Sequence, residues 1–173
     1  MFSSLRTQLV IYKAHIEEPN VYNGRKMLQI SIIGLGLMGK QHLKAIHEHP
    51  DCNIASVIDN TSEAKKIASE QCHPYFTSLR EAIDVTKPDG LIVATPNSRH
   101  FQDSFLALEA GIPILVEKPI SDSIDDAAKL IELGKKTNVP ILTGYHRRHN
   151  PIVFEVKKKL DEGYIGTVVA MHG

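Results

Sequence analysis

The sequence predicts an α/β protein built on a doubly wound parallel β-sheet. Three observations support this prediction. An apolar segment, 27–33, leads directly into the glycine-rich turn Gly34-Leu35-Gly36-Leu37-Met38-Gly39. A second apolar run follows and ends on Asp59, and short apolar runs then alternate with helical patterns as far as residue 142. Such alternation is typical of a parallel sheet whose connecting helices cover both faces, as in the Rossmann fold.

The glycine-rich turn lies between the predicted first strand, 27–33, and a predicted helix, 40–49. In this pattern the first glycine allows a tight turn, the second lets the backbone approach a pyrophosphate, and the third lets the helix pack closely on the strand. The start of the helix directs unpaired N–H groups and a partial positive charge at the phosphates. We therefore expect the turn to bind a dinucleotide. The residues concerned are Gly34, Gly36, Leu37, Met38 and Gly39.

Asp59 ends the predicted second strand, 54–58, and is followed by Asn60. A carboxylate here can accept hydrogen bonds from both hydroxyls of an adenosine ribose and repels a 2′-phosphate. The pattern therefore favours NAD over NADP, although Lys65 and Lys66 leave room for NADP. Glycine-rich turns are common, so a flavodoxin-like or other doubly wound domain whose first turn binds nothing is the alternative.

The rest of the chain continues the alternation of strands and helices. Helix starts are predicted at Asn60 with Glu63 as a capping pair, at the capping box of Ser78 and Glu81, and at Ser123. The helix near 99–110 is expected to stop at Gly111, which suits a left-handed position. In the helix after Ser123, one apolar face is predicted from Ala127, Leu130, Ile131 and Gly134. The later strands are expected near residues 73–76, 91–94, 113–117 and 139–142.

Ligands of such sheets bind outside the carboxyl ends of the strands, so the residues after each strand are the candidates for function. The fourth strand is followed by A-T-P-N-S-R-H at 94–100, the fifth by Glu117-Lys118-Pro119, and the sixth by G-Y-H-R-R-H-N-P at 144–151. Pro119 has no backbone donor and keeps Lys118 out of helical geometry. We therefore expect Lys118 to be held at the strand end.

Composition argues against several classes of partner. Twenty basic residues balance twenty acidic ones, so neither a nucleic-acid nor a membrane partner is expected. Cys52 and Cys72 are too few for a disulfide framework, and no segment resembles a membrane span or a signal peptide; we expect a cytoplasmic protein. No metal is expected either, because the histidines near residues 47–49 and 146–149 have no second ligand pair at zinc spacing.

Four motifs occur along the chain in this order: G-L-G-L-M-G, A-T-P-N-S-R-H, V-E-K-P and G-Y-H-R-R-H-N-P. Residues 27–173 resemble the nucleotide domain of the glucose-fructose oxidoreductase and inositol dehydrogenase family, Gfo/Idh/MocA. The resemblance implies NAD(P)-dependent oxidation or reduction at a hydroxyl of a sugar, polyol or related small molecule. It places Glu117 and Lys118 beside the nicotinamide and Arg148 in a loop that bridges cofactor and substrate. It also implies a cofactor groove lined by Thr95, Pro96, Asn97 and His100.

Lys118 is the expected catalytic residue. Moving a hydride from a carbinol carbon requires the hydroxyl proton to leave; an ammonium group can hydrogen-bond the oxygen, and an amine can accept its proton. Partial burial beside the positively charged nicotinamide is expected to lower the lysine pKa to about 7–8. The alternative is that Lys118 contacts only a cofactor ribose or water.

Three segments are expected. They are an N-terminal arm or disordered extension at 1–26, a Rossmann domain at 27–150, and the start of a second α/β domain at 151–173. Segment 1–26, with a candidate strand at 9–12 and a turn at 17–20, could also arise from a start upstream of Met27. The resemblance implies that family members carry a large second sheet, of which this apparently truncated chain supplies only a helix near 152–162 and a strand near 165–172.

Two functions are open at this stage. One is an NAD(P)-dependent dehydrogenase that obtains the missing sheet elsewhere, because a half-open pocket leaves hydride transfer exposed to water. The other is a noncatalytic dinucleotide-binding module. A strand without a partner in its own chain is expected to be disordered, to add to a sheet edge or to pair with another copy, and the last of these favours a homo-oligomer formed through the C-terminal strand.

Overall fold

The computed structural model describes residues 27–171. The expectations for segment 1–26 and residue 172 lie outside the described residues. In chain order the elements are β1 (Leu28–Ile33), α2 (Leu37–His47), β2 (Cys52–Ile58), α3 (Ser62–Glu70), β3 (Tyr75–Phe76), α4 (Leu79–Thr86), β4 (Gly90–Val93), α5 (Asn97–Glu109), β5 (Ile114–Val116), α6 (Ile124–Thr137), β6 (Ile141–Thr143), the 3-10 helix η1 (His146–His149) and α7 (Pro151–Asp161).

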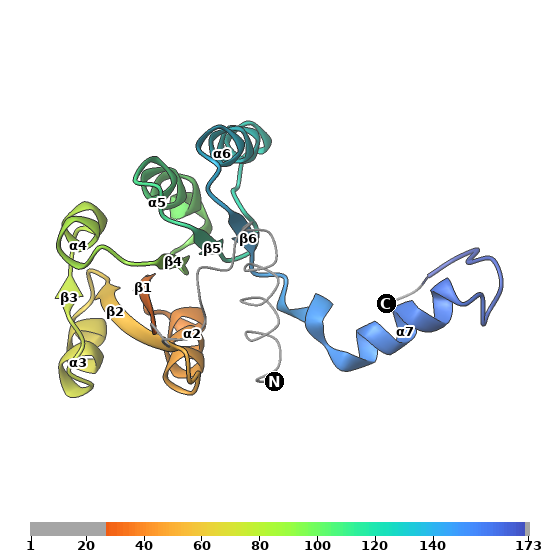
Figure 1. The fold of residues 1–173 in the computed structure, drawn as a ribbon, viewed down its shortest axis with the longest axis horizontal. Helices are drawn as coiled ribbons and strands as arrows, with labels where there is room; N and C mark the ends of the chain where they lie inside the picture. Colours follow the sequence, from red (N-terminus) through yellow and green to blue (C-terminus); the bar gives the residue numbers. More distant parts are fainter. Residues whose placement is uncertain (1–26, 172–173) are drawn as a thin grey trace.

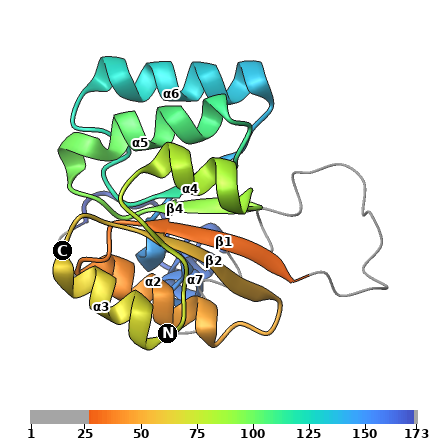
Figure 2. The same cartoon turned by 90° about the vertical axis from the view of Figure 1, so that its left-hand side faces the viewer.

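The strands form one parallel sheet in the order β3-β2-β1-β4-β5-β6. Helices α2 and α3 cover one face, and α4, α5 and α6 cover the other (Figure 1, Figure 2). The strand order reverses between β1 and β4, so the carboxyl ends of these two neighbours form the switch point of the sheet. The predicted doubly wound Rossmann fold is confirmed.

Both faces of the sheet are buried, which explains why its strands read as nearly continuous apolar runs. Ile32 and Ile92 pack beneath α2 and α3 in one core cluster. Their neighbours Ile33 and Val93 point to the opposite face and pack beneath α4, α5 and α6. Because adjacent residues of β1 and β4 enter different cores, these two central strands hold the helical layers together.

The predicted caps agree with the structure at α4 and α6 but not at α3, and α2 and α5 begin three and two residues before their predicted starts. Ser78 and Ser123 cap α4 and α6 as predicted, and Gly111 has the expected positive φ of 74°. The predicted pair of Asn60 with Glu63 is wrong, because Thr61 is the N-cap of α3 and accepts a hydrogen bond from the Ala64 N–H. Thr61 occupies this position because its own N–H and O–H both donate to Asp59.

Helix α6 lies over the β6 edge of the sheet and packs on it through Leu130 and Gly134. Ile131 was predicted on the same buried face but is 47% exposed. The reason is that β6 is the last strand of the sheet, so among the described residues no further strand lies beneath this side of α6. Because the sheet ends at β6, part of the predicted apolar face of α6 is left uncovered.

The segment after β6 leaves the body of the domain (Figure 1). Helix α7 begins at Asn150, whose Oδ1 accepts a hydrogen bond from the Ile152 N–H, and its predicted position is confirmed to within a residue. Residues 165–171 form no strand, so the strand predicted there is wrong for this part of the structure. A strand needs a neighbour for its backbone hydrogen bonds, and the described chain offers none at this place.

Among residues 27–171, every helix is too short or too polar to span a membrane.

Ser31 and Ser56 form a buried polar pair within this apolar sheet. Their hydroxyl oxygens lie 2.7 Å apart on the adjacent strands β1 and β2, and both residues are buried. We expect Ser31→Ala to lower the free energy of unfolding by about 1–3 kcal/mol, because the Ser56 hydroxyl would then be buried without a partner. Urea unfolding measures this loss.

The double variant Ser31→Ala/Ser56→Ala tests the same pair. It should lower the free energy of unfolding by less than the summed losses of the two single variants, since no hydroxyl is left unpaired. Strictly additive losses in the two single variants and the double variant would contradict the role of this hydrogen bond.

Candidate functional site

The glycine turn after β1 has two tightly packed glycines and one open one. A Cβ on Gly34, which has a φ of 88°, would lie 2.6 Å from the Ala94 carbonyl oxygen. A Cβ on Gly39 would lie 1.9 Å from the Gly34 carbonyl oxygen. A Cβ on Gly36 would meet no atom within 4 Å. The first and third glycines therefore form the turn, and the second leaves its backbone open to a ligand, as the sequence analysis expected.

Helices α2 and α5 differ from their neighbours at their first residues. The N-caps of α2 and α5 are Gly36 and Pro96, neither makes a side-chain cap hydrogen bond, and neither helix has an acidic residue in its first turn. By contrast, α3, α4 and α6 each have a side-chain cap and an acidic first turn. The two uncapped helices follow β1 and β4, so their N–H donors and partial positive charges meet at the switch point. This arrangement fits a pyrophosphate.

Leu37 and Met38 lie at the mouth of this turn. Leu37 is the first residue of α2 and is 77% exposed, and Met38 is half-buried. Pro96 and Asn97, at the start of α5, are also exposed, whereas Thr95 is half-buried.

Asp59, at the end of β2, holds the glycine turn. One carboxylate oxygen accepts a hydrogen bond from the Leu35 N–H at 2.7 Å, and the other accepts from the N–H and O–H of Thr61. Burial raises the pKa of Asp59, but the hydrogen bonds from Leu35 and Thr61 outweigh it and hold the pKa below its usual value. A carboxylate has about four acceptor sites, and the chain itself uses most of them. The role of Asp59 at a cofactor ribose stays a prediction.

His42 and Glu117 form a buried pair below the rim of the sheet. His42 Nε2 on α2 lies 2.8 Å from Glu117 Oε1, which follows β5, and the residues are 7% and 6% exposed. Burial raises the pKa of Glu117, but the hydrogen bond from His42 and the attraction to it prevail and lower the pKa. The backbone N–H of Lys118 donates to the second carboxylate oxygen. The Glu117 carboxylate is thus directed at α2, and it fixes the backbone next to Lys118.

His100 ties two loops of the site together. Its side chain is 1% exposed, with Nδ1 2.6 Å from the Pro119 carbonyl oxygen and Nε2 2.8 Å from the Thr95 carbonyl oxygen. The sequence analysis expected His100 to line the cofactor groove. The structure places it beneath the loops instead, because both ring nitrogens face backbone carbonyls. His100 therefore positions the Thr95 loop against the Lys118-Pro119 turn.

Asp103 fixes the same loop from below. Its buried carboxylate accepts hydrogen bonds from the Thr95 hydroxyl and from the Arg99 guanidinium, both at 2.9 Å. The sequence analysis named Thr95 but neither Asp103 nor His42. The spacing in the sequence could have identified both residues. Asp103 lies four residues after Arg99 on α5, and His42 lies three residues after Gly39 on α2, so each shares a helix face with a residue near the site.

Lys118 follows β5 and is joined to Pro119 by a cis peptide bond. The side chain of Lys118 is exposed, so the partial burial that the sequence analysis expected is not provided by the described part of the chain. Arg148 is also exposed, in η1 beyond β6, and Asn60 is exposed after Asp59. The place of all three residues in a cofactor site stays a prediction.

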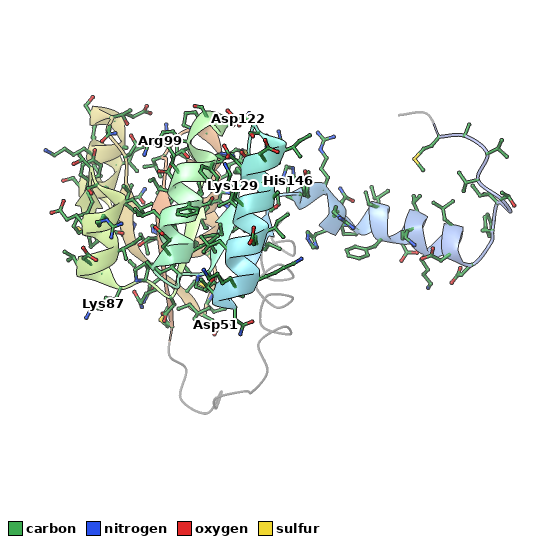
Figure 3. All side chains as sticks on the ribbon, turned by 90° about the horizontal axis from the view of Figure 1, so that it is seen from above. Asp51, Lys87, Arg99, Asp122, Lys129 and His146 are labelled. Carbon is green, nitrogen blue, oxygen red and sulfur yellow. The ribbon has the colours of Figure 1, made fainter. Side chains whose placement is uncertain are left out.

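The side-chain view identifies the two ends of the sheet. Arg99 and Asp122 follow strands β4 and β5 and lie at one end of the domain, whereas Asp51 and Lys87 precede strands β2 and β4 and lie at the other (Figure 3). The glycine turn and the segments after β2, β4 and β5 all belong to the first of these ends. The candidate site therefore occupies a single rim of the sheet.

Comparison with known proteins shows the family of this domain. The family model of the Gfo/Idh/MocA oxidoreductases, described as an NAD-binding Rossmann fold, matches residues 28–145. The chain belongs to this family. The resemblance found in the four sequence motifs is confirmed, and residues 28–145 form the family's NAD-binding Rossmann domain.

Relatives in sequence and in structure extend the comparison. An inositol 2-dehydrogenase of Corynebacterium glutamicum is 30% identical over 152 residues, which cover 86% of this chain and 45% of the relative. A scyllo-inositol dehydrogenase from Lactobacillus casei, solved with bound NAD(H) and scyllo-inositol, superposes with a TM-score of 0.77 at 23% identity and covers 82% of this chain and 43% of its own. An NAD-binding protein from Listeria innocua gives a TM-score of 0.74 at 26% identity, with coverages of 82% and 42%. The chain thus spans less than half the length of these relatives.

The packing of the glycine turn generates a matched pair of variants. Gly39→Ala should lower the free energy of unfolding by about 1–3 kcal/mol, because its Cβ has no space against the Gly34 carbonyl. Gly36→Ala should leave the unfolding midpoint in urea close to that of the unmodified chain. Equal losses in both variants would contradict the division of roles within the turn.

The buried pair of His42 and Glu117 makes stability depend on pH. Because the folded state lowers the pKa of Glu117, its contribution is present at neutral pH and is lost as the pH falls through that lowered pKa. Glu117→Gln should therefore cost about 1–3 kcal/mol at pH 7, and the difference from the unmodified chain should shrink in acid. Urea unfolding of both proteins between pH 7 and pH 3 measures this difference. A difference that stays constant over this range would show that the charge on Glu117 is unimportant.

Proposed function

We propose that the rim residues of this domain bind NAD and that the chain forms the nucleotide-binding part of a dehydrogenase. The reaction class is hydride transfer between NAD and a hydroxyl-bearing carbon of a polyol or sugar-like molecule. The observation that carries the proposal is the pair of uncapped helices at the switch point, with the open Gly36 between β1 and α2. Family membership and relatives named inositol dehydrogenases support the choice of cofactor and of substrate class.

The predicted site residues divide into two groups. One group contacts the cofactor: the open turn holds the pyrophosphate, Asp59 and Asn60 face the adenosine ribose, and the start of α5 lines the groove. The other group positions the first, since His100 and Glu117 are buried and bonded to neighbouring elements. The contacting residues are Gly36, Leu37, Met38, Asp59, Asn60, Thr95, Pro96, Asn97 and Lys118, with Arg148 reaching from η1. Gly34 and Gly39 shape the turn.

Lys118 is the residue we assign to proton transfer. Oxidation of a carbinol removes a hydride from carbon and a proton from oxygen, and NAD accepts the hydride. The Lys118 amine, held at the strand end by Glu117 and Pro119, is suited to bind the hydroxyl and take its proton. In the described chain Lys118 is exposed, so full activity requires a cover over this rim that excludes water.

A second candidate function is a dinucleotide-binding module without turnover. The exposure of Lys118 favours it. We further propose a cytoplasmic protein that associates with a second copy through the exposed apolar residues of its C-terminal segment. These include Phe154, Tyr164 and Val169.

A binding and turnover assay separates the two functions. NADH should bind the unmodified chain, whereas Gly36→Val should weaken binding at least tenfold by filling the open side of the turn. NAD reduction is then measured with myo-inositol, scyllo-inositol and other polyols. Turnover that disappears in Lys118→Ala, with NADH affinity retained, supports the dehydrogenase. Binding without turnover agrees with the module and also with the nucleotide-binding part of a dehydrogenase that lacks its cover, whereas an unmodified chain that fails to bind NADH contradicts both.

The charge of Asp59 generates a prediction about cofactor choice. Asp59→Asn removes the repulsion of a 2′-phosphate, so the ratio of NADPH to NADH affinity should rise about tenfold. Asn60→Ala, one residue away, is the matched control and should leave this ratio unchanged. Fluorescence titration with both cofactors gives the ratio. An unchanged preference in Asp59→Asn would remove Asp59 from the ribose site.

A further inference from the structure

Two histidines meet at the end of the domain opposite the cofactor rim. His47 is the last residue of α2, and His73 lies between α3 and β3. Their Nε2 atoms are 2.8 Å apart, and the ring planes make an angle of 63°. His47 is exposed and His73 is half-buried. The fold thus supplies His47 with a partner 26 residues away in sequence, which sequence spacing could not reveal.

The cavity around this pair has an unusual set of side chains. It has a volume of about 600 Å³, and six of its lining residues carry imidazole, thiol or thioether groups: Met27, His47, His49, Cys52, Cys72 and His73. Among the described residues that line it, none is an aspartate or glutamate. Imidazole and sulfur donors favour zinc, copper and nickel, whereas magnesium and calcium require oxygen ligands. The lining therefore selects for transition metals.

The distance between the two nitrogens suits a shared metal ion. Two nitrogens that each lie about 2.0–2.1 Å from a metal are about 2.9 Å apart at a right angle and about 3.3 Å apart at a tetrahedral angle. The observed 2.8 Å is close to the right-angle value, which is the geometry of Cu²⁺ and Ni²⁺ sites. A tetrahedral Zn²⁺ site would require the rings to separate by about 0.5 Å.

We propose that His47 and His73 form a binding site for a divalent transition-metal ion, with affinity in the order Cu²⁺, Ni²⁺, Zn²⁺. In the metal-free pair one Nε2 donates its proton to the other. On binding, that ring carries its proton on Nδ1 instead, and both Nε2 lone pairs bind the metal without net proton release from a neutral pair. No third histidine, cysteine or carboxylate among residues 27–171 is in place to coordinate, so water completes the coordination.

A metal ion bound here would stabilise the fold and would leave cofactor binding unchanged. The metal would join the end of α2 to the segment that leads into β3, at the amino-terminal end of the sheet. Binding to the folded chain alone should raise the unfolding midpoint by about 3–6 °C at a metal concentration ten times the dissociation constant. NADH affinity should stay unchanged, because the glycine turn lies at the other end of α2.

The test uses the untagged full chain without NAD. CuCl₂, NiCl₂ and ZnCl₂ are titrated by calorimetry and by thermal unfolding, with MgCl₂ as the ion that should have no effect. His47→Gln and His73→Gln should each weaken Ni²⁺ binding at least tenfold. The electron paramagnetic resonance spectrum of bound Cu²⁺ should show coupling to imidazole nitrogen that is lost in both variants.

Two control variants make the outcome decisive. His49→Gln changes another histidine of the same cavity, whose Nδ1 accepts a hydrogen bond from the Asp51 N–H, and it should retain binding. The variant His146→Gln/His149→Gln removes the other histidine cluster and should also retain it. The proposal is overturned if the full chain binds none of the three metals, if His47→Gln and His73→Gln retain full affinity, or if either control loses as much affinity as these two variants.

Discussion

The close contact between the glycine turn and the segment after β4 is the constraint on which the site depends. Gly34 lies so near the Ala94 carbonyl that a single added carbon would collide with it, while the Ala94 N–H donates to the Ile33 carbonyl. This contact places the ends of β1 and β4 side by side. The first turns of α2 and α5 then converge on one point. A surface suited to an anion thus arises from the backbone alone, without any charged side chain.

Around this backbone frame, buried polar side chains connect elements that are distant in sequence. His42 links α2 to the end of β5, and His100 links the loop after β4 to the Lys118-Pro119 turn. Asp103 holds Thr95 from within α5. Each of these groups makes hydrogen bonds inside the protein, although the buried His42 Nδ1 has no partner among the described residues. They therefore set the positions of the exposed residues, while the exposed residues are left to contact ligands.

The sequence was sufficient to predict the fold and the rim, because both follow from local patterns. Apolar runs, capping residues such as Ser78 and Ser123, and the glycine spacing each act over a few residues. The missed features depend on partners that are far apart in the chain. The pairing of His42 with Glu117, the burial of His100 and the meeting of His47 with His73 arise only when the sheet is assembled. The failed strand at 165–171 has the same origin, since β propensity without a neighbouring strand does not specify pairing.

Asp59 has a consequence for how this domain could change its cofactor. Its carboxylate holds Leu35 in the glycine turn and Thr61 at the start of α3. Under the proposed role of Asp59 at the ribose, a replacement that admits a 2′-phosphate and has no acceptor oxygen would also remove the acceptor that orders these two neighbours. A change of nucleotide preference and a loss of domain stability are thus coupled through one side chain. A lineage that switched to the phosphorylated cofactor would need a compensating acceptor for the Leu35 amide before, or together with, the loss of this acid.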